Sequence, residues 1–564
     1  MYFNEITENS FKGIENLRQK IAQAHLLDKN NQIEIPYNNI SELLTDRVKR
    51  YKGDNFITFY SDDEDLIKLN YKEFYVKVNQ LANLLISEGV KKGHKIATYS
   101  YNHIDTVILY FACWLIGAIV VPININEEDS RILYILNNSN SKIIFTRENL
   151  FSKLNEVVRN LKIIVIDKIN FSEFSDELNV DYKIYKETEA LIVYTSGTTG
   201  NPKGVVLTHY NLLVDACYIS EWHKMIEHDS IMCVLPIHHV NGTVVTIMAP
   251  LYAGARIILN QKFHTNRFFN ILESEKVKIV SVVPTLLQFL IHSDEQTNKY
   301  NLTKFSHIIC GAGPLTCELA RSFEKRFSLK IVHGYGLSET TCYSCFIPMN
   351  LDEKEHYKWQ NEYGFPSIGI PLDCNDMDIQ NENGNSLGEN EKGEIVIKGL
   401  NVMKNYFDNE EANEFAFKNG WFRSGDEGFY KTDEKGNKYF FISGRIKELI
   451  IRGGVNISPF EIDEVLSDCP YIISGISVGF ENSWYGEEIG AVVILKDEYK
   501  NGNREHLESE IKKYCWKQLP FNKVPKVIKF LEELPVTSTG KYQRNRVKDL
   551  FEEYKDKRFL RFAL

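Results

Sequence analysis

The sequence predicts an α/β protein with a large N-terminal domain of layered subdomains and a smaller unit at the C-terminal end. Strand-like apolar runs and amphipathic segments alternate through about residue 440, which is typical of layered α/β subdomains. The chain has 564 residues, more than one hydrophobic core normally organises, and 43% of them are hydrophobic. We therefore expect one domain over residues 1–443 and a second over residues 444–564.

Composition and charge narrow the class of protein. A formal net charge of −10 disfavours a general nucleic-acid-binding protein. Ten cysteines are scattered along the chain, and Met1–Lys20 is polar and lacks the apolar run of a secretory signal, so we expect a reducing, cytoplasmic location. Cys342 and Cys345 have the spacing of half a zinc or redox site, but no second pair stands at a suitable distance, and we interpret both thiols as packing groups.

The longest apolar stretch, Thr106–Val121, is too short to span a bilayer and contains a glycine. It is better explained as a buried helix followed by a strand, so we expect no transmembrane segment.

A loop rich in glycines and hydroxyl groups, Tyr194–Gly204, is the strongest functional signal in the chain. Apolar runs at Leu191–Val193 and Val205–Leu207 predict that it joins two strands. Its glycines let backbone N–H groups converge on phosphate oxygens, its hydroxyls add donors, and Lys203 supplies a countercharge. The same residue types form ordinary turns, so a mobile surface loop is the alternative. A Walker loop opens a helix and has Ser or Thr after its lysine, where this chain has Gly204, which argues against the P-loop class.

Two elements are predicted within the smaller unit. Ser458–Glu461 has the pattern of a capping box with proline at the first helical position, so a helix should start at Pro459. Val527–Leu531 is predicted to be a strand that precedes the loop Pro535–Lys541.

The loop segment YTSGTTGNPKG closely resembles the signature of the adenylate-forming superfamily, which comprises acyl- and aryl-CoA synthetases, adenylation domains of nonribosomal peptide synthetases and beetle luciferases. Further segments resemble the family's other motifs and occur in family order: Leu235–Gly242, Gly311–Leu315, Tyr335–Thr340, Gly393–Gly399, Gly420–Asp426, Gly444–Ile450 and Pro535–Lys541. The resemblance covers most of the chain. It implies a large multi-subdomain N-terminal adenylate-forming domain, a smaller mobile α+β C-terminal lid, an active site between them and a hinge near Lys447.

The resemblance implies a two-step reaction with ATP, Mg²⁺ and a thiol. A fatty, short-chain or aryl carboxylate attacks the α-phosphate to give an acyl-adenylate and pyrophosphate, and the thiol of CoA then displaces AMP. A standalone enzyme that loads the phosphopantetheine of an acyl or peptidyl carrier protein is the alternative. A catalytically silent nucleotide-binding protein would be expected to lack Lys541, Glu339 or Asp426, and all three are present. A luciferase-like oxygenase shares these motifs.

The resemblance also assigns roles to residues of the matched motifs. The nucleotide is expected at Thr195, Ser196, Gly197, Thr198, Thr199, Gly200, Lys203, Gly311, Ala312, Gly313, Gly334, Tyr335, Gly336, Leu337, Asp426 and Arg445. Catalysis is assigned to Lys541, Glu339, Ser338 and His239, and magnesium to Glu339 and Thr195. The acyl pocket is assigned to His239, Val240, Asn241, Gly242 and Thr243, the hinge to Lys447, and the thiol channel to Gly453 and Gly454.

One departure bears on the substrate. Amino-acid adenylation domains usually carry an aspartate near the segment Pro236–Gly242 that pairs with the substrate ammonium, and this chain has Ile237, His238 and His239 there. Burying an unpaired ammonium is costly, so we expect an acid without an α-amino group. We also expect the apolar Val240 and the small residues Gly242 and Thr243 to leave room for an uncharged acyl or aryl body.

Overall fold

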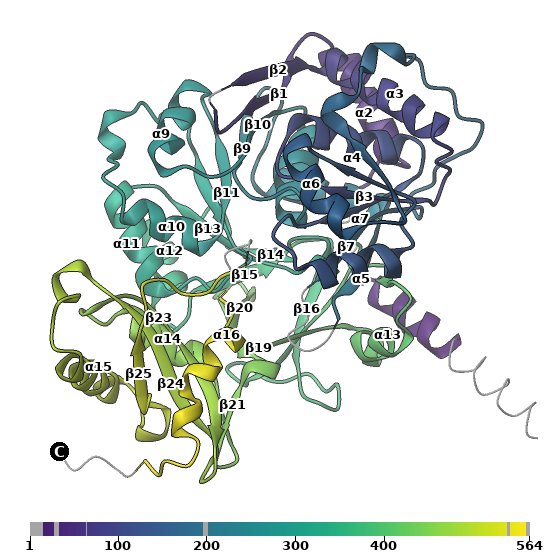
Figure 1. Ribbon diagram of the computed structural model, residues 1–564. Coiled ribbons are helices and arrows are strands. Elements are labelled where there is room, and N and C mark those ends of the chain that lie inside the picture. The colour runs from purple at the N-terminus through teal and green to yellow at the C-terminus, as the bar shows by residue number, and fades with distance from the viewer. Residues whose placement is uncertain (1–14, 28–32, 64, 196–200, 538–541, 560–564) are drawn as a thin grey trace, which may run out of the picture.

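The computed structural model describes residues 15–27, 33–63, 65–195, 201–537 and 542–559. It shows a large N-terminal domain built on two sheets and a smaller C-terminal domain built on a third (Figure 1). The predicted α/β fold with a large and a small domain is therefore confirmed. The exact boundary at residues 443 and 444 stays a prediction.

The first sheet of the large domain has seven strands. In spatial order they are β18 (Asn405–Tyr406), β8 (Lys203–Thr208), β7 (Glu189–Thr195), β4 (Ile119–Ile123), β3 (Lys95–Tyr99), β5 (Ile143–Thr146) and β6 (Lys162–Val165). Strands β7, β4, β3, β5 and β6 pair in parallel, whereas β7 and β8 are antiparallel and carry the glycine-rich loop between them. The prediction that this loop joins two strands is thus confirmed.

The second sheet of the large domain has thirteen strands. In spatial order they are β16 (Asn375–Gln380), β17 (Gly393–Gly399), β19 (Phe422–Thr432), β20 (Lys438–Arg445), β15 (Ser367–Pro371), β14 (Cys345–Phe346), β13 (Ile331–Tyr335), β12 (His307–Cys310), β11 (Ile279–Val282), β9 (Ser230–Cys233), β10 (Arg256–Asn260), β1 (Asn55–Tyr60) and β2 (Leu66–Asn70). Strands β13 to β1 in this order are parallel, and the strands beyond β13 are antiparallel.

Helices fill the space between the two sheets and cover their outer faces. The inner layer packs both sheets into one core and consists of α2 (Ile40–Tyr51), α3 (Tyr71–Ser87), α4 (Ile104–Leu115), α7 (His209–Trp222), the π-helix η3 (Asn241–Met248) and α8 (Ala249–Ala253). The outer faces are covered by α5 (Asp129–Ser139) and α6 (Glu148–Val157) on one sheet and by α9 (Thr265–Ser274), α10 (Pro284–Ile291) and α11 (Cys317–Phe327) on the other. Helix α12 (Glu353–Asn361) packs beside α11, and helix α13 (Glu410–Ala416) packs against β18 and β19.

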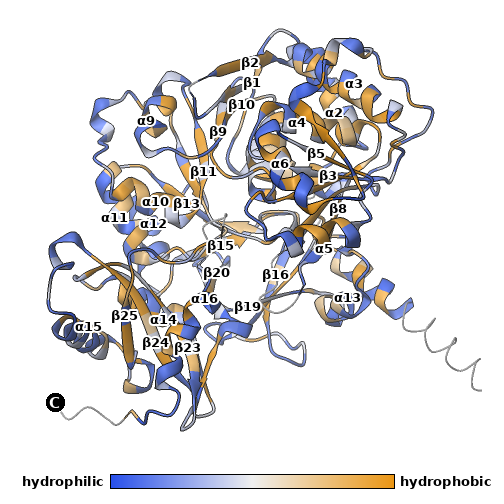
Figure 2. Ribbon diagram, viewed as in Figure 1, coloured by the Kyte–Doolittle hydropathy of each residue, from blue (hydrophilic) through white to orange (hydrophobic). Residues whose placement is uncertain are grey.

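The smaller C-terminal domain, which we call the lid after its expected role, has its own five-stranded sheet. Its strands are β22 (Val455–Ile457), β21 (Ile450–Arg452), β24 (Gly486–Leu495), β23 (Ile472–Asn482) and β25 (Val527–Phe530), and its helices are α14 (Pro459–Ser467), α15 (Arg504–Gln518) and α16 (Asn545–Lys548). Helices α14 and α15 share one core with this sheet, and the segment after α16 packs on the other face. Figure 2 shows apolar strands and a mostly hydrophilic α15, as expected for a helix with one face in solvent.

The predicted local elements are found close to their expected positions. The apolar stretch near residue 106 forms α4 followed by β4, and β25 occupies the predicted strand position. Within the described part of the chain, no helix is both long and apolar enough to cross a bilayer. All ten cysteines are buried, Cys342 and Cys345 among them.

The helix predicted from Pro459 starts there, but the capping box is wrong. The Ser458 hydroxyl accepts a hydrogen bond from the Phe460 N–H at 3.1 Å and donates to the Ser443 carbonyl. The Glu461 carboxylate does not return to the cap, because Lys392 and Lys523 hold it in ion pairs.

Candidate active site

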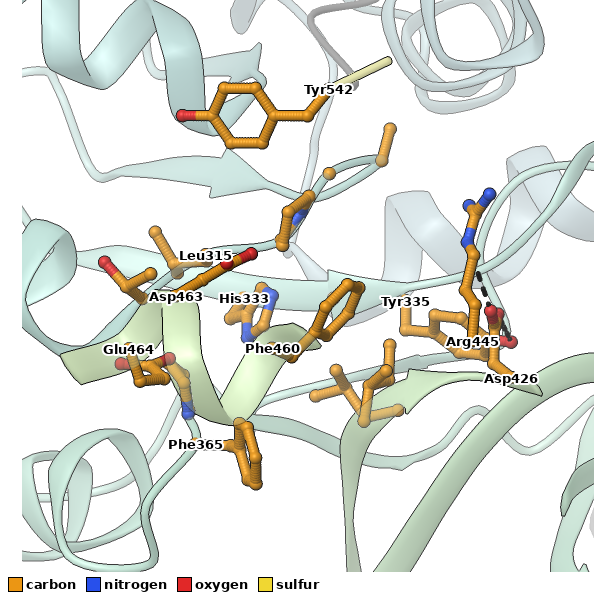
Figure 3. Close-up of a pocket in the computed structure, with 18 of the residues that line it drawn as sticks. Leu315, His333, Tyr335, Phe365, Asp426, Arg445, Phe460, Asp463, Glu464 and Tyr542 are labelled. Carbon is orange, nitrogen blue, oxygen red and sulfur yellow. Dashed lines mark hydrogen bonds and ion pairs between the residues drawn. The ribbon is translucent and has the colours of Figure 1, made fainter. Parts of the chain in front are cut away.

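A cavity of about 320 Å³ opens between the two domains and collects most of the predicted site residues that the structure describes. Its lining includes Thr195, Lys203, His239, Val240, Asn241, Ala312, Gly336, Leu337, Ser338, Glu339, Asp426, Arg445 and Lys447. A second cavity of about 110 Å³ adjoins it and shares Asp426 and Arg445. The second cavity adds Gly313, Gly334 and Tyr335 to the predicted residues that line a cavity (Figure 3).

Several predicted residues are placed elsewhere. Gly311 lies outside both linings, and a methyl group added to it would lie 2.5 Å from the Tyr343 hydroxyl oxygen. Gly453 and Gly454 form the turn between β21 and β22, with φ values of +58° and +81°, and line neither cavity. The predictions for Ser196–Gly200 and for Lys541 fall outside the described residues.

The structure does not place Gly242 and Thr243 at the cavity, so their role in leaving room for the acyl body stays a prediction. Gly242 packs so tightly against the backbone of Pro236 that an added methyl group would overlap the carbonyl oxygen. The Thr243 hydroxyl donates to the Ile237 carbonyl at 2.6 Å. The small side chains therefore serve the close packing of the π-helix against the preceding loop.

Lys203 reaches the cavity from the start of β8, directly across from Thr195 in the β7–β8 ladder. Its Nζ lies 4.9 Å from the centre of the Tyr406 ring. Burial and the nearby Lys447 charge lower the pKa of Lys203, although Glu339 partly offsets them. Two like charges held near each other at a cavity wall make a favourable environment for an anion such as a polyphosphate.

Glu339 lies in the short helix η5 (Ser338–Thr340) and faces the same cavity. The Tyr406 hydroxyl donates to its Oε1 at 2.8 Å, and the Met403 N–H donates to its carbonyl oxygen at 2.7 Å. These two bonds fix both the side chain and the backbone of Glu339. A carboxylate held beside hydroxyl groups suits a hard cation such as Mg²⁺, so the donor set fits the predicted metal.

Tyr335, Asp426 and Arg445 form a second fixed group at the junction of the two cavities. The Tyr335 hydroxyl donates to Asp426 Oδ2 at 2.7 Å, and Arg445 Nε lies 3.4 Å from Asp426 Oδ1 (Figure 3). The last two residues are cross-strand partners on β19 and β20, so the ladder itself brings them together. Asp426 is only 5% exposed, and both neighbours orient its carboxylate, which can accept hydrogen bonds from the hydroxyl groups of a ligand.

A buried network lies beneath the cavity and contains residues that sequence reasoning missed. Asp215 on α7 accepts hydrogen bonds from Asn401 Nδ2 at 3.0 Å and from the Tyr343 N–H at 3.3 Å. The same Asn401 amide donates to the Tyr343 carbonyl at 2.8 Å. Burial raises the pKa of Asp215 to about 8. No motif announces this network, because its members come from three segments that meet only in the folded core.

The lid contributes directly to the site. Thr537 lines the larger cavity, and Tyr542 and Arg544 line the smaller one. Figure 3 shows Phe460, Asp463 and Glu464 of α14 beside His333 and Tyr335 of the large domain. The Cys317 N–H at the start of α11 donates to Glu464 Oε2 at 3.1 Å, so this carboxylate joins the two domains. Burial raises the pKa of Glu464 well above its ordinary range.

Comparison with known families agrees with this geometry. The model of the AMP-binding enzyme family matches residues 44–407, and the model of the AMP-binding enzyme C-terminal domain matches residues 461–541. The chain is 32% identical to an oxalate–CoA ligase of Arabidopsis thaliana, over 86% of this chain and 94% of that protein. It is 29% identical to a long-chain-fatty-acid–CoA ligase of Bacillus subtilis, over 92% and 95%. Both of these relatives are CoA ligases.

A solved structure shows the same fold. The o-succinylbenzoate CoA synthetase of Bacillus subtilis, in complex with its acyl-adenylate intermediate, superposes with a TM-score of 0.78 at 26% sequence identity. The match covers 91% of this chain and 98% of that chain.

Proposed function

The chain belongs to the AMP-binding enzyme family, and on that premise we propose that it activates a carboxylic acid with ATP and passes the acyl group to CoA. The observation that carries the proposal is that one cavity gathers Lys203, Glu339 and Asp426 from three distant segments. The lid adds Thr537 to the same cavity. A cation, a metal-binding carboxylate and a hydroxyl-binding carboxylate are the groups that an adenylating enzyme needs around its nucleotide.

In the first step a carboxylate oxygen of the acid attacks the α-phosphorus of ATP. A new O–P bond forms, the bond to the bridging oxygen breaks, and pyrophosphate leaves with the electron pair. Two anions must approach each other, so the protein contributes mainly positive charge and positioning. In our proposal Lys203 holds the phosphates, Asp426 holds the ribose hydroxyls, and Glu339 holds the Mg²⁺ that accompanies ATP.

In the second step the sulfur of CoA attacks the acyl carbon of the adenylate, AMP leaves, and the thiol proton is released to solvent. We propose that the structure corresponds to the first step. Thr537 and Tyr542 are the described residues on either side of Lys541, and both line a cavity. The Gly453–Gly454 turn lines neither, so a rotation of the lid about Lys447 would be needed to present it to the site.

The acid is proposed to lack an α-amino group. The carboxylates in the cavity lining are Glu339, Asp426 and Glu448, and none of them comes from the segment that includes Pro236, His239 and Val240. Burial lowers the pKa of His238 to about 4, so this ring is neutral at pH 7. An ammonium beside this segment would have no carboxylate partner from it to offset its loss of hydration.

The test is a pyrophosphate-release assay over a panel of acids, each supplied with ATP and Mg²⁺, with and without CoA. Acids are paired with their α-amino counterparts, such as propionate with alanine and 3-phenylpropionate with phenylalanine. We expect pyrophosphate release with the acids, thioester formation with CoA, and little activity with the amino acids. A consistent preference for the amino acids, or thioester formation only on a phosphopantetheine carrier protein, would contradict the proposal.

A further inference from the structure

We infer that Tyr343 closes the acyl pocket, so that this enzyme accepts short carboxylic acids with an uncharged tail; the inference rests on the proposed function. Tyr343 lines the larger cavity, and its side chain is only 1% exposed. The Phe346 ring packs against the Tyr343 ring, Ser281 is joined to Tyr343 through Asn241, and neither Phe346 nor Ser281 lines the cavity. We therefore place the end of the accessible space at the Tyr343 ring.

The ring is held from several directions. Asn241 Nδ2 donates to the Tyr343 hydroxyl at 3.1 Å, and Ser281 Oγ donates to Asn241 Oδ1 at 2.7 Å. On the other side, the ring centre lies 4.4 Å from that of Phe346, and the hydroxyl end packs against Gly311. A tyrosine fixed in this way cannot swing aside without leaving a buried polar group unpaired. The Tyr343 ring is therefore expected to stay in place when substrate binds, rather than to move aside for a longer acid.

The backbone anchors of Tyr343 are independent of its side chain. Its N–H donates to Asp215 and its carbonyl accepts from Asn401, as described above. Substitution of the ring leaves both bonds in place, because they involve only the main chain. The side chain can therefore be tested with the wall's support intact.

The chemistry of the remaining wall indicates the kind of tail. The lining also includes the apolar or uncharged side chains of Leu235, Pro236, Val240, Val283 and Cys342, together with the His239 imidazole. Among the described residues, the lysines and arginines of the lining are Lys203, Arg423, Arg445 and Lys447, which come from the segments assigned to the nucleotide and the hinge. A second carboxylate at the tail would therefore meet no lysine or arginine from the acyl segment, so a small apolar tail fits best. A total of about 320 Å³ lies at the small end of the range for ligand sites and must also admit part of ATP.

The experiment compares kcat/KM for pyrophosphate release with propionate, butyrate, malonate, octanoate and laurate. For the natural enzyme we expect a decrease of at least about 100-fold from butyrate to octanoate, because one excess methylene already costs about tenfold or more in a closed pocket. Malonate should also be at least about tenfold poorer than butyrate. Tyr343→Ala should raise kcat/KM for octanoate by at least about tenfold and reduce it for butyrate, since the ring's volume becomes available to the longer chain.

Tyr343→Phe is the matched control, because it keeps the ring and removes only the hydroxyl. It should keep the chain-length profile of the natural enzyme. If Tyr343→Ala does not fold, Tyr343→Leu leaves a smaller opening and should shift the optimum by fewer carbons.

Equal rates with octanoate and butyrate in the natural enzyme, or a preference for malonate, would overturn the inference while leaving the proposed function intact. An unchanged profile in folded Tyr343→Ala would also overturn it. Failure of every acid to release pyrophosphate would instead contradict the proposed function itself.

Discussion

The two sides of the cavity are held together by different kinds of interaction. Below the acyl pocket, Asp215, Asn241, Asn401 and Tyr343 are buried and joined by hydrogen bonds within one domain. Across the domain boundary, ion pairs with partly exposed side chains join the lid to the large domain, in addition to the buried Glu464 contact described above. Examples are the Arg321–Asp468 pair at 3.2 Å and the Lys392–Glu461 pair at 2.6 Å.

This difference suits the two-step reaction that we propose. Buried hydrogen bonds are costly to break singly, so the pocket floor keeps one shape through both steps. Half-exposed ion pairs contribute about 0–1 kcal/mol each and exchange readily with water, so the lid can leave its position without a large barrier. We therefore expect the buried network of Asp215, Asn241, Asn401 and Tyr343 to keep its geometry, whereas the contacts between the lid and the large domain can break.

The largest effect on adenylate formation is expected from substitution of Lys541. Lys541→Ala should reduce adenylate formation by about 100-fold or more, because its charge is needed chiefly in the transition state, while ATP binding stays measurable. The measurement is single-turnover pyrophosphate release alongside equilibrium ATP binding. Lys548→Ala is the control, because this lid lysine is paired with Glu487 and lines neither cavity. Adenylate formation near the natural rate in Lys541→Ala would remove Lys541 from the mechanism.

Substitution of Asp215 in the buried network should lower the free energy of unfolding. Asp215→Ala leaves the Tyr343 N–H and an Asn401 donor without a buried acceptor, so we expect a loss of about 2–4 kcal/mol in the free energy of unfolding. Chemical denaturation measures this loss. A change below about 0.5 kcal/mol would show that the network is not a structural support.

Asp215 also predicts a pH dependence. Its folded-state pKa is raised to about 8 by burial, so the folded protein retains a proton that the unfolded chain releases above about pH 4. The stability that this group contributes is therefore full near pH 4 and is lost as the pH rises toward 8. Asp215→Asn does not titrate, so its melting temperature should fall less between pH 5 and 8 than that of the natural protein. Parallel melting curves for the two proteins would be evidence against the raised pKa.

Substitution at the predicted hinge, Lys447, should affect the two half-reactions to different extents. Lys447→Pro restricts this position to φ near −65°, so we expect thioester formation from preformed adenylate to fall at least about tenfold, with a smaller effect on adenylation. Lys447→Ala keeps the backbone freedom and removes only the charge beside Lys203, and it should preserve the ratio of the two rates. Equal losses in both half-reactions of the proline variant would argue against a hinge here.

The smallest effect is expected at the domain contact. Glu464→Ala removes the acceptor for the α11 N-terminus and should slow adenylation by about three- to tenfold, whereas Glu464→Gln keeps an acceptor and should lose less. Arg321→Ala breaks a half-exposed ion pair and should change the rate by less than about twofold. These rates are measured with saturating ATP and acid. An Arg321 effect larger than the Glu464 effect would reverse our view of how the lid is held.

Much of the fold and of the candidate site could be predicted because their signals are local. The β7–β8 hairpin around the glycine-rich loop is specified by apolar runs on both sides of it. The start of α14 at Pro459 follows from a proline preceded by serine, although the expected capping box did not form, because Glu461 found two lysines from other segments.

The chemical groups of the candidate site could be found from the sequence, because they lie in motifs that follow a recognisable order along the chain. The structure brings Lys203, Glu339, Asp426 and Arg445 to one cavity. What supports that cavity depends on tertiary contacts. Tyr406 contacts Glu339 because β18 pairs with β8 across about two hundred residues, and the Tyr343 ring is held at the cavity by Asn241 and Phe346. Contacts of this kind depend on which distant segments share a core, and no local pattern of residues encodes that choice.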